Sequence, residues 1–272
     1  MTRADIETDL PAPPEPDADT GWALFLDVDG TLLDIACHPD DVHVDTRLHG
    51  NLVRLHDRLN GALALLSGRS LSQLDALFDW HGWPAAGLHG AELRTADGHE
   101  CLTGGDDVLA AIREHAAAFA AATQGVILED KRRALALHYR HAPEARAAAE
   151  RIARALIDKL EGRYALQHGD HVIELKPAGV DKGCALAALM RDAPFRGRRP
   201  WMLGDDLTDE DAFTHVNASG GVSVIVGARR PTAARFALAD PAAVRAWLHA
   251  LVTRPAHASA PGSGDHGPIE RR

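Results

Sequence analysis

The chain has few cysteines, no long apolar run and no surplus of basic residues. Its three cysteines, Cys37, Cys101 and Cys184, form no CxxC pair, which argues against a zinc site or a disulfide framework and indicates a reducing compartment. No apolar run is long enough to cross a bilayer, and residues 1–20 lack the apolar centre of a signal peptide. We therefore expect a cytoplasmic protein that does not associate with membranes.

The deficit of basic residues gives the 272-residue chain a formal net charge of -10. Binding to a nucleic-acid backbone needs basic surface, so we do not expect a general nucleic-acid binder. An anionic ligand would require positive charge that is concentrated at one place. The remaining composition, 46% hydrophobic and 25% charged, is typical of a globular protein with one large domain or two modest ones.

Buried strands alternate with amphipathic helices over most of the chain, between tails at residues 1–19 and 253–272. This alternation predicts an α/β fold, a parallel sheet flanked by helices. The expected elements are strands at 22–27, 62–66, 200–203 and 222–226, a short strand before Gly87, and helices at 45–60 and 182–191, around Leu74, around Phe213, from Pro231 and up to Leu251.

The pattern changes between residues 104 and 178. There the order becomes helix, two strands, helix, two strands, which predicts a small α+β unit with helices on one face of an antiparallel sheet. The expected elements are helices at 106–123 and 143–160 and strands at 125–129, 134–140, 164–167 and 171–175. We predict an inserted cap domain, 104–178, within a core formed by residues 20–103 and 179–252.

Two carboxylates follow the first predicted strand, in the motif Asp27-Val28-Asp29-Gly30-Thr31. The carboxyl ends of parallel strands are where α/β sheets bind their ligands. Asp27 and Asp29 are two residues apart, so in an extended segment both side chains point the same way. Close carboxylates repel each other unless a cation lies between them. The motif therefore suits a nucleophile, a proton donor and a divalent metal.

Two alternatives compete for this motif. An EF-hand calcium loop that began at Asp27 would need glycine at the position of Leu32 and glutamate at the position of His38, so this alternative fails. The other alternative is a solvated acidic turn, which would be favoured if the motif stood alone.

Three further groups at other element ends favour a site. Ser67 directly follows a strand, and its hydroxyl can bind a phosphoryl oxygen or cap a helix. Lys182 begins a helix, where it suits a phosphate, although a lone lysine is more often a surface residue. Asp205 follows a later strand, so it can share a metal with Asp27, although acidic runs are often solvated.

These four signatures, residues 27–31, Ser67, Lys182 and residues 204–206, together resemble the haloacid dehalogenase superfamily of phosphotransferases. The resemblance covers roughly residues 22–252 and implies a Rossmannoid core with a cap. Within the superfamily, the chain is most similar to trehalose-6-phosphate phosphatases. The segments that carry this similarity are 204–213, 87–92, 129–131, 138–140 and 174–177, with Asp130 where relatives often have asparagine.

The resemblance implies a two-step phosphoryl transfer. Asp27 would attack phosphorus to form an aspartyl-phosphate, and Asp29 would protonate the departing sugar oxygen and then activate water. Lys182 would act in catalysis by offsetting negative charge. Ser67, Gly68 and Lys182 would bind the phosphate oxygens.

The resemblance also implies a Mg²⁺ cofactor. Its protein ligands would be the carboxylates of Asp27 and Asp205 and the backbone carbonyl of Asp29, with waters completing the shell. Asp206 and Asp209 would orient those waters.

Sugar recognition is assigned by resemblance to Glu129, Lys131, Glu174 and Lys176 in the cap and to His89 in the core. Carboxylates and amines suit the many hydroxyls of a disaccharide. The alternative is that the cap residues are exposed charges that make weak ion pairs. A metal or base role for His89 or His138 is disfavoured, because Mg²⁺ prefers oxygen ligands.

Cap closure would exclude water, with Gly104, Gly105 and Gly179 at the hinge. The expected partner is a small sugar phosphate, and we expect a monomer. Phosphatases for mannosyl-3-phosphoglycerate or sucrose phosphate remain alternatives. A non-catalytic sugar-phosphate-binding module would predict a broken acid, and a dehalogenase would not need Asp29 or a metal, so both are disfavoured.

Overall fold

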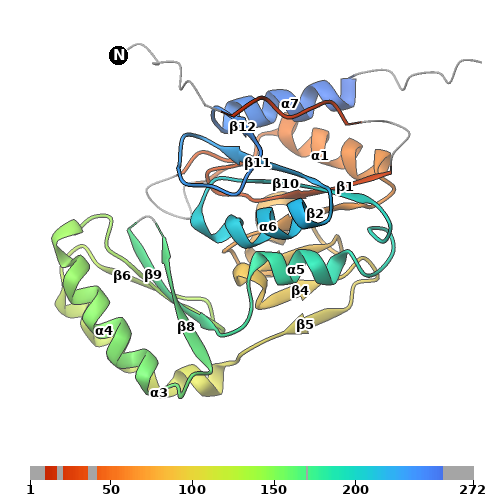
Figure 1. Ribbon diagram of the computed structural model, residues 1–272. Coiled ribbons are helices and arrows are strands. Elements are labelled where there is room, and N and C mark those ends of the chain that lie inside the picture. The colour runs from red at the N-terminus through yellow and green to blue at the C-terminus, as the bar shows by residue number, and fades with distance from the viewer. Residues whose placement is uncertain (1–9, 17–20, 36–41, 170, 254–272) are drawn as a thin grey trace, which may run out of the picture.

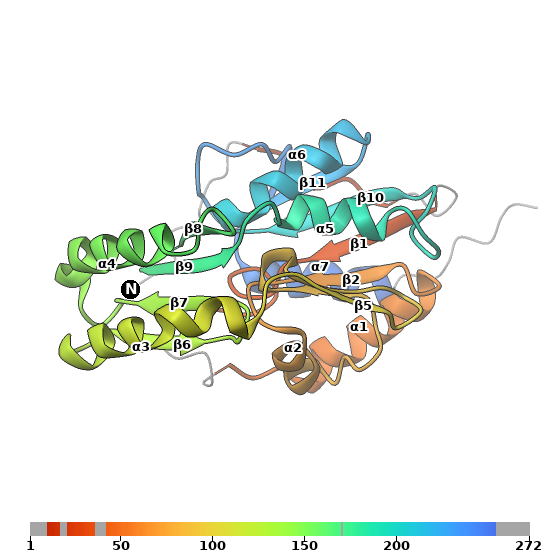
Figure 2. The same cartoon turned by 90° about the horizontal axis from the view of Figure 1, so that it is seen from below.

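The computed structural model describes residues 10–16, 21–35, 42–169 and 171–253. Cys37 and most of both predicted tails lie outside these residues. The described chain forms two sheets, each with its own apolar cluster. The smaller unit projects from one end of the larger one (Figure 2). We call the larger unit the core, and we call the smaller one, residues 106–177, the insert.

The core sheet has eight strands in the order β12-β11-β10-β1-β2-β3-β4-β5. The first six are parallel, and β4 and β5 run antiparallel at one edge. Their bounds are β1 (Trp22–Leu26), β2 (Leu63–Leu66), β3 (Ala85–Gly87), β4 (Glu92–Arg94), β5 (Glu100–Leu102), β10 (Arg199–Gly204), β11 (Val222–Val226) and β12 (Phe236–Leu238). The expected α/β sheet is thus confirmed, in mixed form.

Helices cover both faces of this sheet. Helices α1 and α7 pack together on one face, and α5 and α6 pack together on the other (Figure 1). The core helices are α1 (Thr46–Arg58), α2 (Leu71–Phe78), α5 (Lys182–Leu189), α6 (Glu210–Ala218) and α7 (Pro241–Thr253). None of the described helices combines the length and the apolar character needed to cross a membrane.

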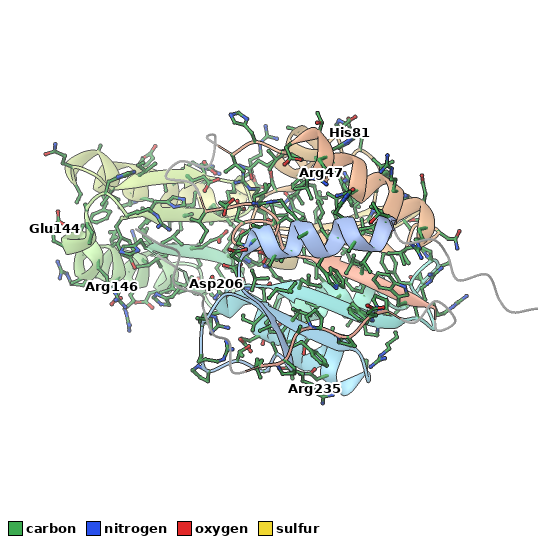
Figure 3. All side chains as sticks on the ribbon, turned by 90° about the horizontal axis from the view of Figure 1, so that it is seen from above. Arg47, His81, Glu144, Arg146, Asp206 and Arg235 are labelled. Atoms are coloured by element: carbon green, nitrogen blue, oxygen red, sulfur yellow. The ribbon has the colours of Figure 1, made fainter. Side chains whose placement is uncertain are left out.

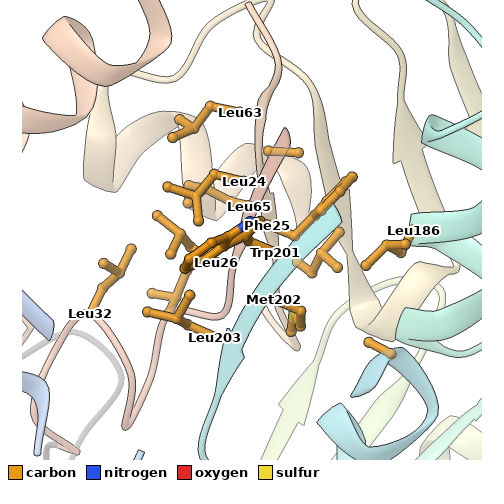
Figure 4. Packing of buried hydrophobic residues seen from close by; sticks show 14 of the residues in the cluster. Leu24, Phe25, Leu26, Leu32, Leu63, Leu65, Leu186, Trp201, Met202 and Leu203 are labelled. Carbon is orange, nitrogen blue, oxygen red and sulfur yellow. The ribbon is translucent and has the colours of Figure 1, made fainter. Parts of the chain in front are cut away.

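The two central strands, β1 and β10, are apolar on both faces because helices cover both sides. Leu24, Leu26 and Leu203 are completely buried (Figure 4), and the ring of Phe25 stacks on that of Phe195 with centroids 5.2 Å apart. Burying such a side chain contributes about 1.5–3 kcal/mol. This packing fixes the strand ends that carry the acids.

The insert is an antiparallel sheet in the order β6-β7-β9-β8. Figure 1 shows its two helices on the side away from the core. Alternation decides the faces: Leu135, Leu137, Ile173 and Leu175 are buried in the insert's own apolar cluster. The elements are α3 (Asp106–Ala122), β6 (Ile127–Asp130), β7 (Leu135–His138), α4 (Arg146–Asp158), β8 (Tyr164–Gly169) and β9 (Val172–Pro177). The order of helices and strands expected here is confirmed.

The helix expected from Pro231 is wrong. Residues 231–235 form a loop that leads into β12, although proline at a helix start and the following alanines favour a helix. Tertiary contacts override this preference: the Ala233 backbone N–H donates to Glu210 Oε2 at 2.7 Å, and Arg235 N donates to the Ser223 carbonyl at 3.1 Å. The short β4–β5 hairpin was not predicted either.

The described part of the N-terminal segment, residues 10–16, reaches the edge of the core sheet. The Pro11 carbonyl accepts a hydrogen bond from Ala237 N on β12, at 2.9 Å. An exposed strand edge is a template for unwanted pairing, and this contact covers part of it. The tail character predicted for the terminal residues outside the described ranges stays a prediction.

Candidate active site

The two central strands deliver their acids to one place. β1 and β10 are parallel neighbours, so Asp27 and Asp205 leave the sheet at the same edge. Oxygens of Asp27, Asp205 and Asp209 lie within 4.8 Å of one another. The loop after β1 approaches so closely that a Cβ at Gly30, whose φ is +88°, would lie 2.1 Å from Asp205 Oδ2. Thr31 Oγ1 donates to Asp205 Oδ1 at 3.3 Å.

Lys182 lies between two of these carboxylates. Its Nζ donates to Asp27 Oδ1 at 2.6 Å and to Asp209 Oδ1 at 2.7 Å. Asp181 caps α5 by accepting from Cys184 N at 2.7 Å, which fixes the helix start that carries Lys182. Burial alone would lower the pKa of Lys182, but the charges of Asp209 and Asp27 raise it. Lys182 is therefore a buried, permanently charged cation.

Asp209 is completely buried and organises the acidic loop. Its Oδ2 accepts from the backbone N–H groups of Asp205 and Asp206, at 3.0 Å each, while its Oδ1 accepts from Lys182. Both oxygens are thus engaged. Asp209 therefore suits an orienting role better than direct coordination, and the role expected from the sequence stays a prediction.

The carboxylate cluster fits a metal ion with oxygen ligands. Burial, together with the charge of Asp209 and against the effect of Lys182, raises the pKa of Asp27 to about 7. Burial and the charges of Asp27 and Asp209 raise the pKa of Asp205 to about 9. Among these groups, three carboxylates gather around one lysine, so negative charge exceeds positive charge. A hard divalent cation would offset this excess, and carboxylate oxygens are the donors it prefers.

Asp29 turns toward Arg69, a residue outside the predicted site. Arg69 Nε donates to Asp29 Oδ2 at 2.7 Å, and Arg69 Nη2 donates to Asp29 Oδ1 at 2.6 Å. The loop that begins at Ser67 carries Arg69, and Ser67 Oγ, which is buried, accepts from Arg69 N at 3.1 Å. A cation two residues after the serine at a strand end was the available signal.

Three of the four predicted sugar-binding residues of the insert, Glu129, Lys131 and Glu174, contact the core, and Glu174 does so through His89. Glu174 Oε2 lies 3.0 Å from His89 Nε2, and Lys131 Nζ donates to Glu174 Oε1 at 3.3 Å. Lys131 Nζ also donates to the Gly68 carbonyl at 2.9 Å, which links the insert to the loop that follows β2. A Cβ at Gly68 would lie 2.8 Å from the His89 ring, so the imidazole position requires glycine.

The cations of this group stabilise the charged forms of its two carboxylates, whereas burial and the charges of Lys182 and Lys131 lower the pKa of His89. Burial alone would raise the pKa of Glu174, but the charges of Lys131 and His89 lower it to about 2. Glu129 also has its pKa lowered to about 2, against burial, by a hydrogen bond from His138 and the charge of Lys131. Both carboxylates are thus ionised at neutral pH and can accept hydrogen bonds from sugar hydroxyls.

Glu129 reaches both units, because Gln73 of the core donates to it at 3.3 Å and His138 of the insert lies 2.9 Å from it. Lys176, the fourth predicted residue, instead donates to the Val180 carbonyl at 2.7 Å, at the base of the insert. The structure does not join Lys176 to the other three by a hydrogen bond, and its sugar-binding role stays a prediction.

A cleft of about 640 Å³ opens beside this group. Glu129 and Lys131 line it from the insert, and Gln73 and Glu92 line it from the core. Its described lining does not include the acids after β1 and β10. Figure 3 shows Asp206, which directly follows Asp205, where the insert meets the core.

A parallel sheet with an acid pair after one central strand, an acid after its neighbour and a buried lysine defines the chain as a phosphotransferase of the haloacid dehalogenase type. The family model described as trehalose-phosphatase matches residues 25–242. The chain belongs to the trehalose-phosphatase family.

Curated relatives agree. The chain is 44% identical over 208 residues to a probable trehalose-phosphate phosphatase of Sinorhizobium fredii, covering 76% of this chain and 78% of the relative. It is 42% identical over 241 residues to the trehalose-6-phosphate phosphatase of Escherichia coli, covering 88% and 89%. A solved C-terminal domain of the Candida albicans trehalose-6-phosphate phosphatase shares the fold, with a TM-score of 0.77 at 23% identity, covering 89% and 98%.

Proposed function

We propose that this chain hydrolyses trehalose 6-phosphate to trehalose and phosphate. One observation carries the proposal: Lys131, paired with Glu174 on the sugar-facing side, donates to the carbonyl of Gly68, inside the loop expected to bind phosphate. A sugar held by the insert would therefore present its phosphate to the core acids. Family membership supports the same substrate.

The reaction has two balanced steps. An oxygen of Asp27 attacks phosphorus, the bond from phosphorus to the sugar oxygen breaks, and that oxygen keeps the electron pair and takes a proton from Asp29. Trehalose leaves, and Asp27 carries the phosphoryl group. Asp29 then accepts a proton from water as the water attacks phosphorus, and the electron pair returns to the Asp27 carboxylate.

Positive charge lowers the repulsion between Asp27 and the phosphate. Lys182 contributes one charge, and Ser67 with the N–H groups near Gly68 would bind the phosphoryl oxygens. We propose Mg²⁺ as the cofactor, held by the carboxylates of Asp27 and Asp205 and the carbonyl of Asp29. When bound, it would supply charge stabilisation to the phosphoryl group.

The insert acts as a cap in this proposal, with residues 104–178 moving on a core of 20–103 and 179–252. Glycines suit the hinge: Gly104 and Gly179 have φ values of +76° and +74°. A Cβ at Gly104 would lie 2.6 Å from the Tyr164 hydroxyl, so only glycine fits there. A monomer in the cytoplasm is the state we propose for the working enzyme.

A substrate panel tests the function. Phosphate release from trehalose 6-phosphate would be compared with release from sucrose phosphate and mannosyl-3-phosphoglycerate, with and without a chelator. We expect trehalose 6-phosphate to have the highest kcat/KM, and chelation to stop turnover until Mg²⁺ is restored. Faster turnover of either other substrate would overturn the substrate assignment.

A further inference from the structure

We propose that Arg69 is a positioning residue that holds the carboxyl group of Asp29 for proton transfer. This inference rests on the proposed function, in which Asp29 exchanges a proton with the sugar oxygen and then with water. It adds a residue to the four signatures that pointed to the site.

The contact between the two side chains is a two-bond fork. Nε and Nη2 of Arg69 reach different oxygens of Asp29, at 2.7 and 2.6 Å. Paired bonds of this kind fix the plane of a carboxylate as well as its distance, which a single point charge cannot do. The side chain of Asp29 is 37% exposed, so its packing alone does not restrict it to one rotamer, whereas the side chain of Arg69 is 13% exposed.

The backbone of Arg69 is itself held on two sides. Its N–H donates to Ser67 Oγ at 3.1 Å, and its carbonyl accepts from Leu88 N at 2.9 Å. A Cβ at Gly87 would lie 2.8 Å from that carbonyl, so the close packing requires glycine there. The guanidinium therefore projects from a fixed strand-end loop.

The same loop receives the insert, because Lys131 donates to the carbonyl of Gly68, the residue before Arg69. The charge of Lys131 also interacts with Asp29. The loop of residues 67–69 thus contacts Asp29 through Arg69 and Lys131 through Gly68. If the carboxyl group of Asp29 were misplaced, the rest of the site would still hold the sugar, and only proton transfer would suffer.

Substrates whose leaving groups differ in their need for a proton can distinguish a positioning role of Arg69 from a binding role. When the bond from phosphorus to a sugar oxygen breaks, that oxygen holds an electron pair and needs the proton of Asp29. Both oxygens of Asp29 accept from Arg69, so the oxygen that carries the proton must release its bond of the fork while the other oxygen keeps its own. A nitrophenolate leaves without protonation. Asp29 is therefore needed in the first step only for the sugar phosphate. In the second step, the attack of water on the phosphoryl group of Asp27, it is needed for both substrates.

The test compares Arg69→Met and Arg69→Lys with the wild type on trehalose 6-phosphate and on 4-nitrophenyl phosphate. The matched control is Arg146→Met, which breaks the exposed ion pair between Arg146 and Glu150 at the far end of the insert (Figure 3). For Arg69→Met we expect kcat on trehalose 6-phosphate to fall about 100-fold, the scale of general acid catalysis, with KM within about threefold.

On 4-nitrophenyl phosphate, Arg69→Met should still release about one nitrophenolate per enzyme in a rapid burst, followed by slow turnover. That burst also shows that the variant is folded. Arg69→Lys should recover little, because the fork is lost. Unchanged kcat, a rise in KM alone or loss of the burst would overturn the inference while leaving the proposed function standing. A wild type inactive on trehalose 6-phosphate would instead overturn the proposed function and this inference with it.

Discussion

The core and the insert each hold a lysine between hydrogen-bond acceptors, but the two lysines differ in whether those acceptors belong to one unit or to both. Lys182 has both carboxylate partners, Asp27 and Asp209, within the core. Lys131 has the carboxylates of Glu174 and Glu129 as partners in the insert, and the carbonyl of Gly68 as a partner in the core. The contacts of Lys182 are therefore complete within one unit, whereas those of Lys131, in the proposed sugar site, form only where the two units meet.

This difference matches the two tasks. Charge stabilisation works best when its groups are preorganised, because they then need no rearrangement during the reaction. Sugar recognition gains from closure, because binding energy from the sugar can bring the units together and exclude water. Changes in the core should therefore affect every substrate, and changes in the insert should affect only the natural one.

The largest effect is expected from Asp27→Asn, which removes the nucleophile. Asparagine keeps an oxygen that can accept from Lys182, so the fold should survive. We expect phosphate release to fall by about 10⁴-fold or more on sugar and aryl phosphates alike. Phosphate assays and thermal unfolding check both points, and retained activity in a folded, metal-supplied sample would sink the nucleophile assignment.

Asp205→Asn should act on metal binding. Removing a carboxylate from the cluster should raise the half-saturating Mg²⁺ concentration by about tenfold or more, since even outer partners of metal ligands change affinity by 10–100-fold. Calorimetry and the Mg²⁺ dependence of phosphate release measure the shift. The control is Asp211→Asn, an exposed acid in the same run, which should leave the Mg²⁺ dependence unchanged. Equal behaviour of the two variants would argue against Asp205 as a ligand.

Glu174→Gln should distinguish the role of the insert from that of the core, because it should impair turnover of the sugar substrate alone. Losing a charged acceptor typically costs about 1.5–3 kcal/mol, or roughly 10–100-fold, and we expect this loss in kcat/KM for trehalose 6-phosphate. Turnover of 4-nitrophenyl phosphate should change by less than about threefold, because no sugar is present. Glu144→Gln, at the far end of the insert in Figure 3, is the control. Equal loss on both substrates would contradict sugar recognition by the insert.

The clustering of Asp27, Asp205 and Lys182 could be predicted because the ends of elements determine it. A buried run followed by an acid places that acid at the carboxyl edge of a parallel sheet, and Asp27 and Asp205 follow neighbouring strands. The helix start at Lys182 adds a fixed direction. Local sequence therefore predicted three residues far apart in the chain and close in space.

Arg69 was missed because its role depends on contacts that no local pattern encodes. Its direction follows from Leu88 and Gly87, and Leu88 and His89 have positive φ values of 48° and 55°, which are unusual for residues other than glycine. Lys176 shows the reverse case: its charge and register suit a sugar ligand, yet its contact is with the Val180 carbonyl. Side-chain partners across a two-unit interface require the fold itself.

The smallest effect concerns the pH dependence of stability. The pKa of Glu174 falls from 4.5 to about 2 on folding, so its contribution is complete above pH 4.5 and is lost as pH falls toward 2. This contribution is at most about 3 kcal/mol. Thermal unfolding of wild type and Glu174→Gln at pH 6, 5, 4 and 3 measures it. The wild type should be more stable at pH 6, and the gap should narrow below pH 4.5; a gap that stays constant would mean that Glu174 is not held as a buried, paired carboxylate.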